Sequence, residues 1–186
     1  MRARSLGILV LGVLLLTAIV ELGMGRLPLG PDGRFAWWEA DIWSQSQSQR
    51  FADPYSFTHV VHGLLFYGLL WIVARRSRLS SRFLAAVLLE AAWEILENSP
   101  IIIDRYRAVT IALGYVGDSV LNSVSDVAMM ALGFLLAARL PVWITVALVI
   151  LCELGLLFWV RDNLTLNIIM LVYPLDAIRT WQMAGH

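Results

Sequence analysis

Ionisable side chains recur inside the apolar stretches of this 186-residue chain, where such groups are rare. Glu90, Glu94 and Glu97 stand four and three residues apart, so a helix would carry them on one stripe. Neighbouring carboxyl groups in a low-dielectric site do not all ionise, and a protonated and an ionised partner together suit general acid–base catalysis. The same pair would suit a proton-coupled carrier. Glu90 lies deepest and is interpreted as a supporting or structural group.

Two other apolar stretches carry polar groups at helical spacing. His59 and His62 stand three residues apart, and Asp118, Asn122 and Asp126 follow one another at intervals of four. A rise of about 1.5 Å per residue places these histidines, Asn122, Asp126 and the two outer glutamates in one layer, roughly 5–14 Å below the outer membrane surface. Ionisable groups at such depth usually face a bundle interior or a wet cavity. The predicted catalytic residues are His59, His62, Glu94, Glu97 and Asp126.

Metal binding is an alternative use of the same side chains. His59 with His62, and Glu94 with Glu97, are neighbours on their helices, and imidazole with carboxylate suits zinc, iron or manganese. The Glu-x-x-His signature of helical di-metal proteins is absent. We therefore predict no cofactor and keep a divalent metal on these four residues as the alternative. A plain hydrogen-bonded network that fixes helix packing is the third interpretation.

Arginines are expected just above this polar layer. Arg105 and Arg107 lie in the string DRYR, and Arg161 follows the last long apolar stretch. Arginine is the usual residue for bidentate capture of carboxylate or phosphate, so we expect a rim that binds a lipid headgroup or another anionic molecule. The predicted substrate-binding residues are Asn98, Arg105, Arg107, Asp118, Asn122, Arg161, Asn163 and Asn167.

The composition indicates which elements must position these groups. The chain is 59% apolar and 15% charged, against about 45–50% and about 25% in a soluble domain. Its mean hydropathy is +0.73. The 14 basic residues, all arginine, equal the 14 acidic ones, which argues against nucleic-acid binding. A single cysteine, Cys152, excludes an intrachain disulfide and a cysteine zinc cage.

We therefore predict an all-α, polytopic transmembrane bundle that forms one domain over residues 1–186. The five expected spans are approximately residues 6–24, 55–74, 83–103, 119–138 and 142–160. Residues 1–24 are expected to be an uncleaved signal anchor, with a cleaved signal peptide as the alternative. Residues 25–54 are expected to form an outer interfacial segment with a short surface helix, and residues 55–160 a four-span core.

Residues 161–186 are expected to form a C-terminal segment with an interfacial or re-entrant helix. The apolar stretch LTLNIIMLVY reaches only about 15 Å as a helix and cannot span alone, although a sixth, kinked span is the alternative. Orientation follows from the loop that contains Arg75, Arg76, Arg78 and Arg82 without an acid. Positive loops stay in the cytoplasm, so the N-terminus is also predicted to be cytoplasmic.

Four strings resemble one bacterial family of short multi-pass membrane proteins that is catalogued as uncharacterised. They are DPYSFTHVVHG, WEILENSPIIIDRYR, GYVGDSVLNSVSD and RDNLTLN, and the resemblance covers roughly Asp53 to Gln182. It implies an inner-membrane location and no particular activity. A weaker similarity, in the order of the motifs alone, is to VanZ-like membrane proteins, and it would suggest cell-envelope or lipid-linked work.

Three functions remain open at this point. The first is an enzyme with an outward-facing site that acts on a lipid or lipid-linked anionic substrate. The second is a small proton-coupled carrier, and the third is an accessory or structural subunit that binds a partner protein. The expected partners are the lipid bilayer and a lipid headgroup or lipid-linked substrate, without nucleic acid. The sequence leaves the enzyme question and the oligomeric state undecided.

Overall fold

The computed structural model describes residues 3–184, which are helical apart from turns, loops and one isolated bridge between Trp38 and Ala52. The helices are α1 (Ala3–Gly23), α2 (Ser56–Val73), α3 (Leu79–Glu97), α4 (Pro100–Val109), α5 (Val120–Ala137), α6 (Val142–Val160), α7 (Leu164–Val172) and α8 (Asp176–Met183). Four of them, α1, α2, α5 and α6, are long and apolar enough to cross a membrane. The remaining predicted span, the third along the chain, corresponds to α3, which matches these helices in length but carries Arg82 and three glutamates.

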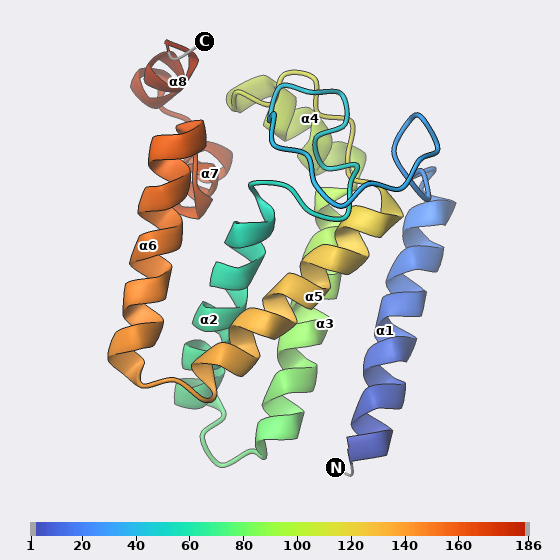
Figure 1. Ribbon diagram of the computed structural model, residues 1–186, viewed down its shortest axis with the longest axis vertical. Coiled ribbons are helices and arrows are strands. Elements are labelled where there is room, and N and C mark those ends of the chain that lie inside the picture. The colour runs from blue at the N-terminus through green and yellow to red at the C-terminus, as the bar shows by residue number, and fades with distance from the viewer. Residues whose placement is uncertain (1–2, 185–186) are drawn as a thin grey trace.

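The long helices run lengthwise, with α5 oblique to the others, and the short elements gather at one end (Figure 1). That end holds the loop of residues 25–54, α4, α7 and α8. The N-terminus and the short turns after α2 and after α5 lie at the opposite end. The first end is called the outer end below. It holds the loops that adjoin the polar ends of the long helices.

The third predicted span is wrong in its extent. Instead of one helix over residues 83–103, α3 ends at Glu97 and α4 begins at Pro100. Proline breaks the hydrogen-bond ladder inside a helix but suits its first turn. Asn98 fills the break, and its Nδ2 donates to Asp118 Oδ2 and to Ser123 Oγ, each at 3.1 Å. The break is thus tied to the start of α5.

The short surface helix expected within residues 25–54 is also wrong. The segment forms turns and loops that lie across the outer end (Figure 1). Glycines and prolines between residues 25 and 33 disfavour a helix. Further on, polar side chains at the start of α5 donate hydrogen bonds to backbone carbonyls of the loop. Ser119 Oγ donates to Gln49 O at 3.2 Å, and Asn122 Nδ2 donates to Arg50 O at 3.0 Å. These bonds fix the loop over the site.

Helices α2 and α5 are in backbone contact. A Cβ at Gly63 would collide with the backbone of Met130 and Phe134, and a Cβ at Gly133 would collide with that of Val60. Small residues permit such an approach, as expected for Gly133. Around this crossing the three central helices enclose an apolar core of Ala86, Val87, Val127, Met130 and Phe134.

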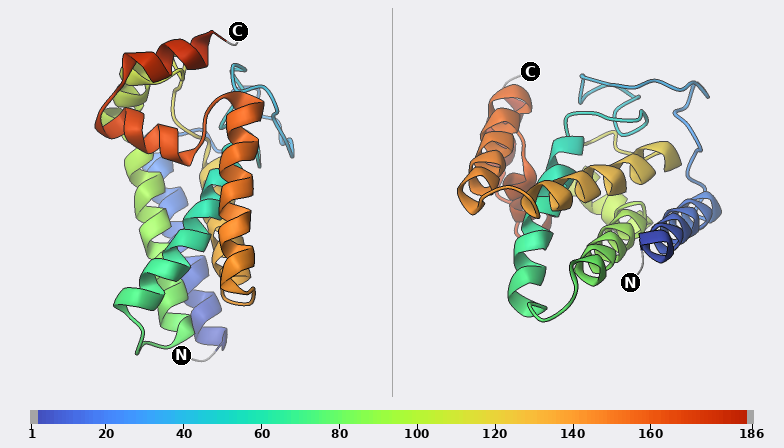
Figure 2. Two further views of the ribbon diagram at one scale, coloured as in Figure 1. Left: turned by 90° about the vertical axis from the view of Figure 1, so that its left-hand side faces the viewer. Right: turned by 60° about the horizontal axis from the view of Figure 1, so that its bottom comes forward.

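The C-terminal segment forms two short helices at the outer end. Helix α7 has nine residues and α8 has eight, so neither is long enough to cross a membrane. Helix α7 lies roughly crosswise to α6 (Figure 2). Its first turn is capped by Asn163, whose Oδ1 accepts from the Leu166 amide at 2.8 Å. Within the described residues, this segment thus contains short helices at the outer end and no helix long enough for a further span.

Candidate functional site

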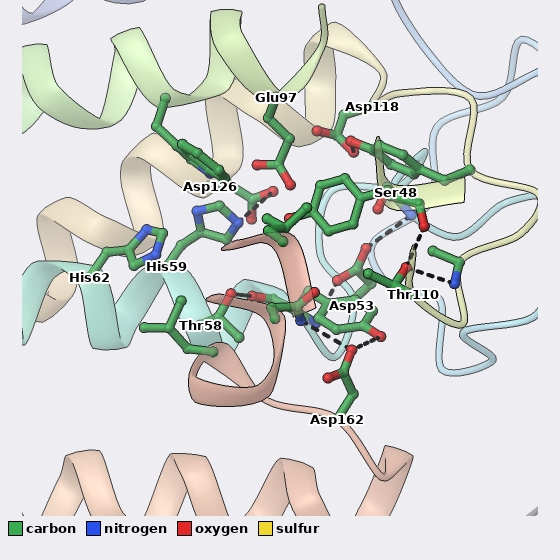
Figure 3. A pocket seen from close by; sticks show the side chains of 18 of the residues that line it. Ser48, Asp53, Thr58, His59, His62, Glu97, Thr110, Asp118, Asp126 and Asp162 are labelled. Carbon is green, nitrogen blue, oxygen red and sulfur yellow. Dashed lines mark hydrogen bonds and ion pairs between the residues drawn. The ribbon is translucent and has the colours of Figure 1, made fainter. Parts of the chain in front are cut away.

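A cavity of about 460 Å³ lies near the outer end, between α2, α3, α4, α5, α7 and the loop of residues 25–54. Figure 3 shows polar side chains pointing into it from several of these elements. Its lining includes both predicted histidines, His59 and His62. Its acidic lining residues are Asp53, Glu97, Asp118, Asp126 and Asp162.

One buried carboxylate holds both imidazoles. Glu90 is fully buried, and its Oε1 lies 2.6 Å from His59 Nδ1 and 2.9 Å from His62 Nδ1. Its Oε2 lies 3.1 Å from the same atom of His62. Since an ionised carboxylate only accepts, each Nδ1 carries the proton in these contacts. The Nε2 atoms are then left as the basic nitrogens of the two rings.

Three further carboxyl groups surround His59. Glu94 Oε1 lies 3.4 Å from His59 Nδ1, and Asp126 Oδ2 lies 3.8 Å from His59 Nε2. Glu97 and Asp126 point toward this ring in Figure 3. Asp126 also accepts from Ser56 Oγ at 3.1 Å. Helices α2, α3 and α5 thus bring the predicted layer together around one imidazole.

Two groups of these side chains have the spacing of a metal site. In His59, His62 and Glu90, and likewise in His59, Glu94 and Glu97, one ligand atom from each residue lies within 4.8 Å of the others. The first group is already joined by hydrogen bonds as short as 2.6 Å. The second group is not, so it is the better candidate for a cation.

Three aspartates line the outer part of the cavity, outside the long helices. Burial raises the pKa of Asp118 to about 7 and that of Asp162 to about 6. Burial also raises the pKa of Asp53 above its ordinary value. Tyrosines oppose the effect in two places, as Tyr115 Oη donates to Asp118 Oδ1 at 2.9 Å and Tyr55 Oη donates to Asp162 Oδ2 at 3.0 Å. Burial thus favours the protonated form of all three carboxyl groups.

The expected arginine rim does not line the cavity. Arg105 Nε donates to Leu171 O at 3.0 Å, and Arg107 Nε donates to Tyr115 O. Arg161 donates to Trp181 O at 3.0 Å and stacks over that indole ring. These side chains tie outer loops and helices together through backbone carbonyls. Among the lining residues of the described chain there is no arginine.

The predicted site residues therefore divide into two sets. The cavity is lined by His59, His62, Glu97, Asp118, Asn122, Asp126 and Asn167. Glu94 lies behind His59, Asn98 fills the helix break, and Asn163 caps α7. The residues outside the lining are Glu94, Asn98, Arg105, Arg107, Arg161 and Asn163.

Sequence reasoning gave no site role to several groups. Glu90 was interpreted only as supporting, although its spacing on the Glu90–Glu94–Glu97 stripe was visible. Asp53 stands three residues before Ser56 at the start of α2, and its carboxylate accepts from the Ser48 amide at 2.9 Å and the Tyr55 amide at 2.7 Å. An aspartate ahead of an apolar helix is a capping signal, which indicated a fixed turn but no cavity.

Comparison with known proteins places the chain in a family. Residues 21–184 match the model of a family described as "Protein of unknown function (DUF2585)". The chain belongs to the DUF2585 family. This agrees with the resemblance to an uncharacterised bacterial family.

Relatives of this DUF2585 chain are similar over nearly their whole length. A UPF0314 protein of Novosphingobium aromaticivorans is 55% identical over 94% of this chain and 90% of its own. UPF0314 proteins of Paracoccus denitrificans and Agrobacterium fabrum are 52% and 51% identical, over 92% and 93% of this chain and 89% and 87% of their own. No solved structure matches. None of these relatives carries a VanZ-like name, so that similarity stays an analogy of motif order.

Proposed function

We propose that this DUF2585 protein is an enzyme of the bacterial inner membrane that transfers protons on a lipid or lipid-linked substrate bound in the outer cavity. Its five spans are α1, α2, α3, α5 and α6, its N-terminus is cytoplasmic, and the cavity faces outward. The arginine-rich turn after α2, at the end opposite the cavity, supports this orientation. The layer of histidine and carboxyl side chains would then lie in the outer half of the bilayer.

The observation that carries the proposal is that the Glu90 carboxylate contacts the Nδ1 atoms of two imidazoles beside the cavity. Both Glu90 oxygens face His62 Nδ1, at 2.9 and 3.1 Å. A carboxylate in that position fixes the tautomer and stabilises an imidazolium, which is how an oriented histidine becomes a general base. His62 would take a substrate proton at Nε2. Glu97 or Asp126, in the same lining, would supply the second proton-transfer group.

The lining suits an amphipathic substrate. The lining includes apolar side chains that would hold a hydrocarbon chain, among them Leu65 and Phe66 of α2 and Ile168 and Leu171 of α7. The same lining carries carboxyl groups and tyrosines, which can hydrogen-bond hydroxyl groups. An anionic headgroup would meet several carboxylates without an arginine in the lining. A hydroxyl-bearing headgroup therefore fits these residues better than the anionic one expected from the sequence.

A carrier fits the packing less well. Transport would need the site to become accessible from the cytoplasmic end. Below the histidines the helices close around the apolar core that contains Ala86, Met130 and Phe134, each without measurable exposure. Such a core suits a site that opens to one face.

The test compares envelope lipids in a strain that lacks the gene. The strain is complemented with the wild-type chain, with His62→Gln or with Asp104→Asn, and its lipids are profiled by mass spectrometry. We expect the empty strain and the His62→Gln strain to accumulate the same lipid species. Asp104 is exposed, with a carboxylate 3.8 Å from Arg107, and its variant should restore the wild-type profile.

The proposal fails if the strain without the gene has the lipid profile of the wild type. It also fails if membrane levels of His62→Gln match the wild type and this variant restores the profile fully. Purification in mild detergent addresses the accessory-subunit alternative, since an obligate partner would be recovered with the chain in a fixed ratio.

A further inference from the structure

Glu94 is a buried carboxyl group without a hydrogen-bond partner. It is fully buried on α3, and within the described part of the chain neither of its oxygens has a hydrogen-bond donor or acceptor. Burying an unpaired carboxyl group is strongly unfavourable. The nearest ring nitrogen is His59 Nδ1, at 3.4 Å, and that nitrogen faces Glu90 at 2.6 Å. A cation held between Glu94 and His59 would offset the cost of burying this carboxylate.

The separation between Glu94 and His59 is that of two ligands on one ion. Nitrogen and oxygen ligands lie about 2.1 Å from zinc, so two of them at a tetrahedral angle are about 3.4 Å apart. The measured distance from His59 Nδ1 to Glu94 Oε1 is 3.4 Å. Glu97 supplies a third ligand atom within 4.8 Å of the other two. The three residues thus have the spacing of three ligands on one ion.

His59 can exchange Glu90 for an ion without leaving Glu90 unpaired. Glu90 keeps His62, whose Nδ1 lies near both of its oxygens. On the far side of the His59 ring, Nε2 faces Asp126 Oδ2 at 3.8 Å. Ligating histidines usually donate their second ring N–H to a carboxylate, which fixes the tautomer. Asp126 is placed for that role if Nδ1 binds the ion.

We propose that His59, Glu94 and Glu97 bind one divalent cation of the zinc or manganese class. Two carboxylates and a neutral imidazole cancel the charge of such an ion, which suits a site inside a bilayer, and the donor set is one that these metals accept. Glu97 lines the cavity, so the fourth coordination position would open toward it. The cation would deepen the proposed function by providing the positive charge that the lining lacks.

The test measures metal binding to the purified full-length chain in detergent. The protein is treated with a chelator, exchanged into metal-free buffer and titrated with Zn²⁺ or Mn²⁺ by calorimetry, and bound metal is counted by mass spectrometry. We expect one ion per wild-type chain. Glu94→Gln and Glu97→Gln should each lower the affinity at least about tenfold. Asp104→Asn, a matched carboxyl-to-amide change at an exposed position of α4, should bind the ion as the wild type does.

Two results would overturn the cation site. One is a wild-type chain that retains no metal at a molar excess of either ion. The other is unchanged affinity in both glutamine variants, each checked for folding by thermal unfolding. The site does not depend on the lipid phenotype: a chain that binds the ion but leaves envelope lipids unchanged refutes the enzyme and keeps the cation. If the lipids change in the strain without the gene but the purified chain binds no metal, the cation site is refuted and the enzyme proposal is kept.

Discussion

Glu90 accepts from two imidazoles at once, so each of its oxygens has a partner on α2. His59 approaches Oε1 alone, and His62 approaches both oxygens. Removing the charge would weaken contacts that no water can replace, because Glu90 is fully buried. The pair therefore links α2 to α3 as well as orienting the rings.

We expect Glu90→Gln to lower the free energy of unfolding by about 1–3 kcal/mol, because an amide leaves one imidazole N–H without a good acceptor. Thermal unfolding of the purified protein, followed by circular dichroism in detergent, measures the change. Asp104→Asn, on an exposed surface, should leave the midpoint unchanged. Equal midpoints for Glu90→Gln and the wild type would show that the shared contact does not stabilise the fold.

Asp118 makes the stability of the outer end depend on pH. Burial raises its pKa from 3.8 to about 7, so folding favours its protonated form. Its stabilising effect is complete below about pH 4, where the unfolded chain is also protonated, and is lost as the pH rises through 7. We expect the thermal unfolding midpoint of the wild type to decrease as the pH is raised from 5 to 8. The midpoint of Asp118→Asn should decrease less over the same interval.

Asp32 provides the contrasting control. A hydrogen bond from Arg50 lowers the pKa of this exposed carboxyl group to about 2. Its contribution is therefore present above about pH 4 and disappears only as the pH falls through 2. Asp32→Asn should leave the slope between pH 5 and 8 intact. A wild-type midpoint that rises over this interval would contradict the role assigned to Asp118.

At the scale of elements, the crossing of α2 and α5 sets the distance between the histidines and Asp126. We expect Gly63→Ala to destabilise the protein by about 1–3 kcal/mol or more, because the new methyl group meets backbone that cannot rotate away. Gly68, on the same helix, has no atom within 4 Å of its missing Cβ. Gly68→Ala should be neutral or stabilising by up to about 1 kcal/mol.

Thermal unfolding of the two glycine variants decides the matter. A Gly63→Ala chain as stable as Gly68→Ala would mean that the two backbones are not in contact. Lower solubility or yield of Gly63→Ala alone would not suffice, so the comparison uses the folded fraction after gel filtration.

Apolar runs predicted the long helices well, because a membrane span is set by length and composition. The structure agrees closely with the span expected at residues 142–160. The break after Asn98 needed Pro100 to be treated as a helix start. The loop of residues 25–54 was misjudged because its hydrogen bonds go to α5, far away in the sequence.

Helical spacing also grouped His59, Glu94 and Asp126 correctly in space, since depth along a helix follows from residue number. Spacing cannot give the direction in which a long side chain extends. Arg105 and Arg161 belong to helix α4 and the end of α6, at the outer end, yet both donate to backbone carbonyls. The partner of each histidine depended on how α2 and α3 rotate, which only the packed bundle determines.

For the molecule as a whole, the proposed topology predicts which loops meet each side of the membrane. Cys152 is the only cysteine and is replaced by serine, and new cysteines are placed at exposed Gln45 or Ser77. In spheroplasts, an impermeant maleimide should label Gln45→Cys directly. It should label Ser77→Cys only after the membrane is permeabilised. The reverse pattern would invert the chain and place the cavity on the cytoplasmic side.

The contact between Gly63 and Gly133 has a consequence for biosynthesis. The ribosome completes α2 and α3 well before α5, which lies beyond α4 in the chain. Until α5 is inserted, Asp126 is absent and α3 has only α1, α2 and α4 to pack against. The contact of Glu90 with the two histidines needs only α2 and α3, so it can form before α5 is present. This contact would hold α2 and α3 together in the bilayer while the rest of the chain is made. Glu90 would therefore act in assembly before it orients the imidazoles of the finished site.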